Sequence, residues 1–271
     1  MTSISTTAAI AAAAERLARA AATGVPSRPV RDLLGPGSVD TAYAVQRLGT
    51  ERRLANGARI VGRKVGLTAP AVQRQLGVDQ PDFGVLFQDM DVTRTPVAHR
   101  PRLLQPKVEA ELAFVLAADL DTGPFDAHSV RTAVAYAAAA LEIVDSRIAD
   151  WDITFADTVA DNASSGWFVL GVERLDLAAF EPREVVMTMT IDGEIVSTGT
   201  GSACLGDPLA ALAWLAETAC AVGDPLRAGD IVLSGALGPM APLPPGAQVR
   251  CELVCDATTL GTAELIMEDT L

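Results

Sequence analysis

Residues 106–116 read Pro-Lys-Val-Glu-Ala-Glu-Leu-Ala-Phe-Val-Leu, a mainly apolar stretch with two acids two positions apart. If the stretch is a strand, its period of two places Glu109 and Glu111 on one face. The opposite face then carries only apolar side chains, Val108, Ala110, Leu112 and Phe114. Alternation alone is also typical of a half-exposed strand with two solvated carboxylates.

A strand that is apolar on both faces is usually buried, and neighbouring buried carboxylates repel each other unless a cation lies between them. This argument favours a metal site. Hard cations such as Mg2+ or Mn2+ take oxygen ligands, so a third carboxylate is needed. Glu142 is the candidate because it lies in the apolar run 141–144, where a lone acid is costly. Asp145 points to the other face, and we expect an ion pair with Arg147 or a turn there.

Composition and charge exclude several functions. The chain has 271 residues and a formal net charge of -13, which disfavours nucleic acid and membrane-surface partners. Its 4 cysteines form no CxxC pair, so free thiols in a reducing compartment are expected, and 2 histidines are too few for a histidine-rich metal site. The best apolar run, 133–144, is too short to span a bilayer. These features predict a cytoplasmic protein.

Helix and strand signals along the chain predict an α+β fold without internal repeats. Helices are expected at residues 5–23, 41–56, 126–140 and 208–222. Strands are expected at residues 58–67, 107–117, 141–144, 185–191, 194–198, 230–234 and 248–255. Ser38 or Asp40 is the expected cap of the second helix, and Asp192-Gly193 predicts a hairpin turn.

Two further segments carry polar residues that are not specific on their own. Residues 157–166 are rich in Asp, Asn and Ser, which also occur in ordinary turns and caps. Lys64 lies in the glycine-flanked run 62–68, where it is either a surface residue with a buried stem or a buried cation near an anionic substrate.

Taken in order, the segments resemble the 2-keto-4-pentenoate hydratases, also called 2-hydroxypenta-2,4-dienoate hydratases, of the fumarylacetoacetate hydrolase superfamily. The segments that carry the resemblance are 61–68, 73–77, 80–84, 109–111, 141–147, 157–164 and 229–240. The resemblance extends from about Arg31 to about Arg250. It implies a mixed β-sandwich roll of the C-terminal-domain type, with an N-terminal helical segment (1–57) and a catalytic mixed-β domain (58–271) in one continuous structural domain.

The resemblance also assigns roles to residues of this chain. Glu109, Glu111 and Glu142 match the family's ligands of a divalent metal, Mg2+ or Mn2+. Lys64 and Asp82 match its catalytic residues. Substrate contacts fall on Ser164, Asn162, Leu67, Ser234 and Gly235. The C-terminal residues 254–261 lack the glycine-rich final strand of relatives, which leaves the register of the last strand open.

The implied activity is a hydro-lyase of aromatic meta-cleavage pathways that adds water to 2-hydroxypenta-2,4-dienoate and gives 4-hydroxy-2-oxopentanoate. A 2-oxo-3-hexenedioate decarboxylase is the closest alternative, although residues 80–84 and 236–240 follow the hydratase pattern. A C–C hydrolase is disfavoured because no histidine precedes His99. A non-catalytic keto-acid-binding subunit is disfavoured because the carboxylates, Lys64 and Asp82 are all present, and such a subunit has no need for paired buried acids. The resemblance further implies a homo-oligomer and contact with a pathway aldolase or decarboxylase.

Overall fold

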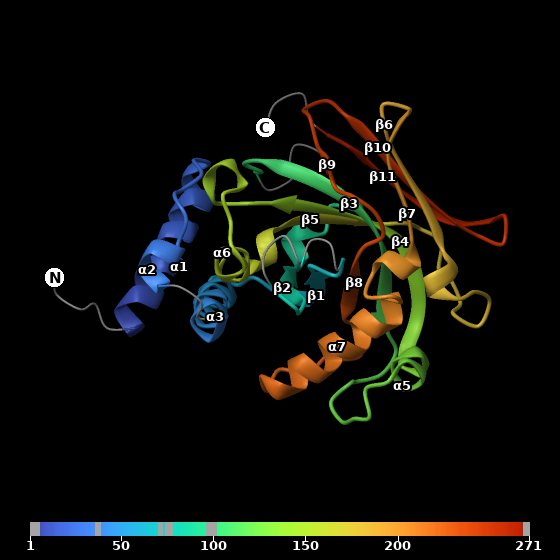
Figure 1. The fold of residues 1–271 in the computed structure, drawn as a ribbon, viewed down its shortest axis with the longest axis horizontal. Helices are drawn as coiled ribbons and strands as arrows, with labels where there is room; N and C mark the ends of the chain where they lie inside the picture. Colours follow the sequence, from blue (N-terminus) through green and yellow to red (C-terminus); the bar gives the residue numbers. More distant parts are fainter. Residues whose placement is uncertain (1–5, 36–38, 70–72, 74–77, 96–101, 268–271) are drawn as a thin grey trace.

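The computed structural model describes residues 6–35, 39–69, 73, 78–95 and 102–267. Its architecture is α+β, as the sequence predicts: the N-terminal helices lie at one side of the molecule, two β-sheets form the rest, and two later helices lie below the sheets in the view of Figure 1. The helices are α1 (Thr6–Thr23), α2 (Arg31–Leu34), α3 (Val39–Ala55), α5 (Ala127–Thr132), α6 (Phe155–Ala160) and α7 (Pro208–Ala221). Short 3-10 turns are η1 (Gln88–Met90), η3 (Ala149–Trp151), η4 (Asn162–Ser164), η5 (Pro182–Glu184) and η6 (Gly201–Ala203).

The larger sheet has 7 strands in the order β2-β1-β8-β3-β4-β5, with β9 paired to β3. In that order its strands are Asp82–Phe87, Ile60–Gly66, Ile231–Ala236, Pro106–Leu116, Val134–Asp145 and Ser165–Leu170, and β9 is Ala241–Pro242. β1 and β8 run parallel, and the other pairs are antiparallel. Because β3 and β4 each have partners on both sides, their backbone is satisfied within the sheet and their side chains can be buried on both faces.

The second sheet has 4 antiparallel strands in the order β11-β10-β6-β7. They are Thr258–Ile266, Gln248–Cys255, Val186–Ile191 and Glu194–Thr200. The predicted hairpin is confirmed, since Ile191 pairs with Glu194 and the backbone is left-handed at the turn residues Asp192 and Gly193. The open register of the last strand is also resolved, because β11 pairs with β10 from Thr258 to Ile266.

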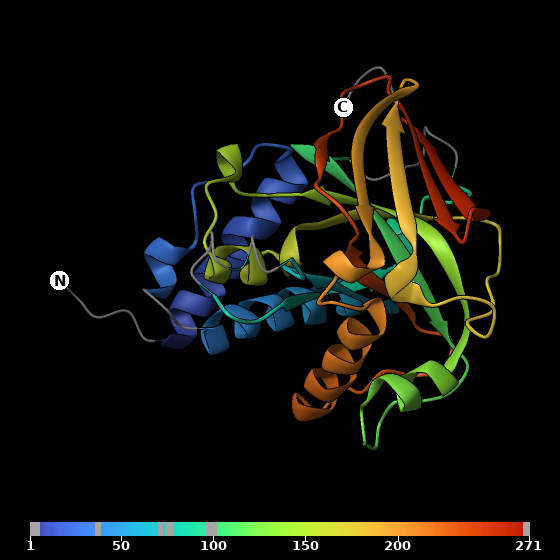
Figure 2. The same cartoon turned by 45° about the vertical axis from the view of Figure 1, so that its right-hand side comes forward.

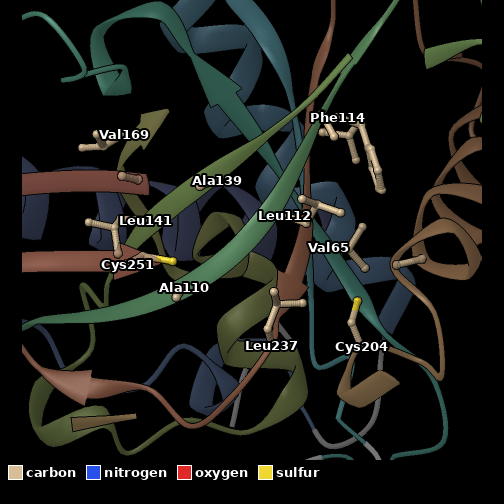
Figure 3. Close-up of a cluster of buried hydrophobic side chains, with 14 of the residues drawn as sticks. Val65, Ala110, Leu112, Phe114, Ala139, Leu141, Val169, Cys204, Leu237 and Cys251 are labelled. Atoms are coloured by element: carbon tan, nitrogen blue, oxygen red, sulfur yellow. The ribbon is translucent and has the colours of Figure 1, made fainter. Parts of the chain in front are cut away.

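The main core lies between the two sheets. Figure 3 shows side chains of β3 and β4 meeting Cys251 of β10 and Leu237 after β8. The apolar face predicted for β3 is in this core, with Val108, Ala110, Leu112 and Phe114 all at most 1% exposed. Burying that face against a second sheet fixes the register of β3, and this leaves the acids on the opposite face.

The expected helix 126–140 is wrong beyond its first part. α5 covers Ala127–Thr132, and the chain then enters the 12-residue strand β4, which includes the predicted strand 141–144. The alanines of β4 have a high helix propensity, but tertiary contacts override it. β4 is buried between β3 and β5, and the small Ala137 and Ala139 let β10 and β11 pack closely on it.

The N-terminal helices form a second cluster with α6, seen at one side of both views (Figures 1 and 2). The predicted first helix is confirmed, and the second begins at Val39, so Asp40 lies in its first turn rather than at its cap. Ser38 lies outside the described residues. Gln46 of α3 donates from Nε2 to the carbonyls of Phe83 (2.9 Å) and Val159 (3.1 Å), which ties the helices to β2 and α6.

Three further expectations concern a helix at 208–222, the state of the cysteines and the lack of a membrane-spanning segment. The predicted helix at 208–222 is α7, with Asp207 as its N-cap. All four cysteines are free, as expected. Over the described part of the chain, the helices lack the length and apolarity that a membrane span needs.

Candidate active site

The three glutamates predicted to bind a metal lie together. Glu109 and Glu142 are directly paired across β3 and β4, and Glu111 follows two residues later on the same face. One carboxylate oxygen from each lies within 4.8 Å of the other two. Glu111 and Glu142 are 0% and 1% exposed, whereas Glu109 is half-buried at the edge of a cleft.

This cluster fits a divalent cation because its charges are otherwise poorly compensated. Oε1 of Glu111 and Oε2 of Glu142 accept no hydrogen bond from the described residues, and Oε1 of Glu142 faces only the ammonium of Lys64. Burial, and then the charge of Glu142, raise the pKa of Glu109 to about 7 and that of Glu111 well above its usual range. Glu111 Oε2 accepts the N–H of Gly235 (2.8 Å), which aims the carboxylate at its neighbours. Oxygen ligands of this number suit Mg2+ or Mn2+.

Lys64 of β1 is the buried cation of the cluster. Its Nζ lies 3.0 Å from Glu142 Oε1, and its side chain is 4% exposed. Burial disfavours the charged ammonium, but Glu142, Asp82 and the two other glutamates outweigh burial and raise the pKa of Lys64. Lys64 is therefore held protonated beside the three carboxylates.

Asp82 begins β2 and lies opposite Gly66 of β1. A Cβ at Gly66 would be 2.2 Å from Asp82 Oδ1, so only glycine leaves room for this carboxylate. Oδ1 accepts no hydrogen bond within the described part of the chain. Burial raises the pKa of Asp82 to about 6, although Lys64 opposes the shift. Asp82 is thus an ionisable group poised just below neutral pH.

A cleft of about 300 Å³ opens onto these residues. Five of the residues selected from the sequence line it: Lys64, Leu67, Asp82, Glu109 and Ser164. The cleft also has an apolar wall, formed by Val144, Trp151, Ile153, Ala163 and Met240. This volume suits a small organic acid.

Ser164 lies in a turn of three consecutive left-handed residues, Asn162, Ala163 and Ser164, with φ of 56°, 51° and 52°. Such a backbone is costly for residues other than glycine and must be held by its surroundings. The Oγ of Ser164 lies 3.2 Å from the Oγ1 of Thr158, another cleft residue. The turn and α6 therefore each present one hydroxyl group at the cleft.

The structure does not bring Asn162 to the cleft. Its Nδ2 donates to the carbonyl of Val85 (2.9 Å), and its Oδ1 accepts the N–H of Val85 (2.8 Å). Both amide atoms are used to tie the turn to β2, so they are not free for a substrate. A Cβ at Gly84 would be 2.5 Å from the carbonyl oxygen of Asn162, which shows how closely β2 follows the turn.

Ser234 and Gly235 also lie outside the cleft lining. Gly235 holds Glu111 through its N–H, and Ser234 is fully buried, with its carbonyl accepting the thiol of Cys204 (2.9 Å). Of the two alternatives expected for Asp145, an ion pair with Arg147 or a turn, the ion pair is wrong. Asp145 accepts the N–H groups of residues 104 and 105, and Arg147 instead pairs with Asp161 (2.6 Å).

Sequence reasoning missed Lys107, Thr158 and the apolar wall. Lys107 lies two residues before Glu109, so the alternation that places the glutamates on one face also places Lys107 there. That signal was present. Trp151 and Thr158 come from η3 and α6, and sequence spacing gives no sign that they approach β3.

A family model described as fumarylacetoacetate (FAA) hydrolase C-terminal matches residues 59–265. The chain therefore belongs to the fumarylacetoacetate hydrolase family, as the sequence motifs predict. It is 52% identical over 241 residues to a 2-keto-4-pentenoate hydratase of Paraburkholderia xenovorans (strain LB400), covering 89% of this chain and 90% of that protein. A 2-hydroxyhexa-2,4-dienoate hydratase of Comamonas testosteroni is 39% identical and covers 86% of this chain and 89% of its own.

Among solved structures, the fold is similar to 4-oxalocrotonate decarboxylase from Pseudomonas putida G7, complexed with magnesium and adipate. The TM-score is 0.88 at 28% sequence identity, over 98% of this chain and 100% of that chain. The predicted fold class is thereby confirmed.

Proposed function

We propose that this protein is a metal-dependent hydratase that adds water to 2-hydroxypenta-2,4-dienoate and releases 4-hydroxy-2-oxopentanoate. The observation that carries the proposal is the convergence of Glu109, Glu111 and Glu142 with Lys64 and Asp82 at one small cleft. The 52% identity to a 2-keto-4-pentenoate hydratase supports this substrate over others of the family.

Glu109, Glu111 and Glu142 are the proposed ligands of Mg2+ or Mn2+. When bound, the cation withdraws electrons from the 2-oxo acid end of the substrate and so makes the distant double bond susceptible to water. The three carboxylates leave one face of the neighbouring strands β3 and β4, with one oxygen of each within 4.8 Å of the other two, so the sheet already brings them together for an ion. A neighbouring solved structure with magnesium supports the choice of a hard cation.

Lys64 and Asp82 are the proposed acid–base pair. The raised pKa of Lys64 keeps its ammonium available as a hydrogen-bond donor to the charge that develops on the substrate. The pKa of Asp82, about 6, leaves it mostly ionised near neutral pH and able to take and return a proton. The reaction adds a proton to C5, the hydroxyl of water to C4 and a proton to C3, while the 2-hydroxyl loses its proton as the 2-oxo group forms, so the net addition is one water.

Ser164, Thr158 and Leu67 are proposed to orient the substrate. The two hydroxyl groups lie at the cleft and share a hydrogen bond of 3.2 Å, so one of them donates to the other and the remaining hydroxyl proton can be donated to a substrate oxygen. The apolar wall of Val144, Trp151, Ile153, Ala163 and Met240 suits the uncharged carbon chain of a dienoate.

The fold similarity to 4-oxalocrotonate decarboxylase makes a 2-oxo-3-hexenedioate decarboxylase the second candidate. That activity involves a substrate with a second carboxylate. The higher identity to hydratases and the apolar wall favour the dienoate. A non-catalytic binding subunit is the third and weakest candidate, because it has no need for buried paired acids.

The wider setting is also proposed from the relatives. We place the reaction in the meta-cleavage breakdown of aromatic compounds in the cytoplasm, catalysed by a homo-oligomer that contacts a pathway aldolase or decarboxylase. The names of the related hydratases support the reaction type.

The test compares the two substrates. Purified protein with Mg2+ or Mn2+ is incubated with 2-hydroxypenta-2,4-dienoate while the dienol absorbance is followed, and in parallel with 2-oxo-3-hexenedioate while CO2 is measured. We expect metal-dependent loss of the dienol and no CO2. An untouched dienol with release of CO2 would replace the hydratase by the decarboxylase.

A further inference from the structure

The two lysines of this chain both line the cleft. The sequence contains 21 lysines and arginines together, and only Lys64 and Lys107 are lysines. Both are cleft residues. Among the lysines and arginines, every residue away from the cleft is therefore an arginine, and the compact ammonium of lysine occurs only at the cleft. Lys64 is accounted for by its ion pair with Glu142 (3.0 Å), but Lys107 has no role in the mechanism above.

The sheet register fixes where Lys107 lies. Lys107, Glu109 and Glu111 alternate along β3, so all three side chains leave the same face. Lys107 is paired with Val144 of β4, one side-chain repeat beyond the pair Glu109–Glu142. That repeat is about 7 Å along a strand. Lys107 therefore stands beside the metal ligands, at the start of the apolar wall.

The ammonium of Lys107 is held by an aromatic ring, and the charge of Glu109 acts on it although the two groups form no ion pair. Its Nζ lies 4.3 Å from the ring centroid of Trp151, whose indole Nε1 donates to the carbonyl of Gln105 (3.0 Å). No ion pair of Lys107 occurs among the described residues. An aromatic face attracts the cation but accepts none of its N–H donors in the way an oxygen does. The donors of Lys107 are thus left for a ligand in the cleft.

The charge balance of the cleft also favours a second ammonium group, that of Lys107, beside the acids. Asp82, Glu109, Glu111 and Glu142 face Lys64, which leaves three negative charges when all are ionised. A divalent metal ion reduces the three negative charges to one, and the positive charge of Lys107 neutralises this last one. An approaching carboxylate then meets a neutral site with an ammonium beside the metal position, within a protein whose net charge of -13 would otherwise repel it.

We propose that Lys107 is a substrate-binding residue that takes the carboxylate of the 2-oxo acid on its ammonium, with Trp151 holding it in position. This inference rests on the proposed function and adds to it the residue that selects for an anionic substrate. Lysine suits the position because its ammonium is a compact point charge on a flexible stem.

The first test measures binding without turnover. The probe is 2-oxopentanoate, titrated by calorimetry into the protein loaded with Mg2+. We expect Lys107→Met to weaken its binding about ten- to hundredfold, as for loss of one charged hydrogen bond, and Lys107→Arg to restore most of it. The matched control is Arg19→Met, which removes one positive charge from the exposed face of α1 and leaves binding unchanged. Mg2+ binding by Lys107→Met is expected to be no weaker than in the wild type.

Equal binding of 2-oxopentanoate to Lys107→Met and wild type would overturn the inference while the proposed function stands. Failure of the wild type itself to consume the dienoate would instead overturn the proposed function, and the inference with it.

The second test uses the wild type and does not depend on a variant folding. Because the chain has only two lysines, acetylation by an N-hydroxysuccinimide ester followed by peptide mass spectrometry reports on the cleft directly. Lys107 is half-buried and is expected to react faster than the enclosed Lys64. We expect 2-oxopentanoate with Mg2+ to slow the acetylation of Lys107 several-fold, whereas the same concentration of chloride does not. An unchanged rate would contradict a bound carboxylate at Lys107.

Discussion

Lys64 and Glu142 form an ion pair that is almost completely enclosed, with Nζ 3.0 Å from Oε1 and side chains 4% and 1% exposed. Lys64 comes from β1 and Glu142 from β4, strands that are separated in the sheet by β8 and β3. The pair thus joins the acid–base side of the cleft to the metal cluster. Removing either partner leaves a buried charge without compensation.

Lys64→Met is therefore expected to destabilise the metal-free protein by about 3–5 kcal/mol, as for other buried pairs that lose one partner. Urea unfolding in a chelator measures this free energy. Arg19→Met serves as the control for a lost surface charge and should change stability by less than about 0.5 kcal/mol. A similarly small effect of Lys64→Met would mean that the pair contributes little to the fold.

Glu109→Gln separates metal binding from folding. It removes one negative charge from a crowded cluster, so the metal-free protein should keep or increase its melting temperature. The rise in melting temperature that Mg2+ gives the wild type should be lost, together with activity. Differential scanning calorimetry with Mg2+ and with chelator makes the comparison. An undiminished Mg2+ effect in Glu109→Gln would remove this residue from the proposed ligands.

Metal binding should depend on pH in a defined direction. The pKa of Glu109 is raised from 4.5 to about 7, so without metal the folded protein binds this proton more tightly than the unfolded chain does. The group's contribution to metal-free stability therefore falls as pH rises from about 4.5 through about 7. Mg2+ needs the ionised carboxylate, so its affinity should rise over the same window. Calorimetric titrations at about pH 5.5 and about pH 8 test this, and equal affinities would contradict it.

The turn that carries Ser164 should depend on Asn162. Asn162→Ala loses two hydrogen bonds to Val85 and places alanine in a left-handed backbone, which should cost about 2 kcal/mol in total. Asn162→Gly loses the same bonds but tolerates the backbone, so it should cost less. Urea unfolding ranks the two variants, and the KM for the dienoate should follow the same order. Glycine costing as much as alanine would show that backbone strain plays no part.

Strands β1, β3, β6, β7, β8 and β10 and the metal cluster could be predicted from the sequence because each leaves a local signal, whereas β2, β5 and β9 were not among the expected strands. Burying a carboxylate in an apolar strand costs free energy wherever the strand lies, so the sequence marks Glu142 as a candidate ligand without any knowledge of its neighbours. The Asp192-Gly193 turn is likewise set by its own backbone. The alanine run of β4 carries no such signal, and only its burial between neighbouring strands decides its conformation.

The rest of the cleft depends on contacts between distant segments. Asn162 looked like a substrate ligand, and its true partner, Val85, is 77 residues away. Trp151 meets Lys107 through a loop whose path follows from tertiary packing. Such pairings are set by the fold as a whole, so spacing along the chain cannot reveal them.

Identification of the reaction product tests the central claim most directly. The protein is stripped of metal, reloaded with Mg2+ and incubated with 2-hydroxypenta-2,4-dienoate, and the mixture is examined by NMR. We predict 4-hydroxy-2-oxopentanoate as the product with Mg2+ and none above the uncatalysed rate without it. Unchanged dienoate in the presence of Mg2+, or the same product at the same rate in chelator, would contradict a metal-dependent hydratase.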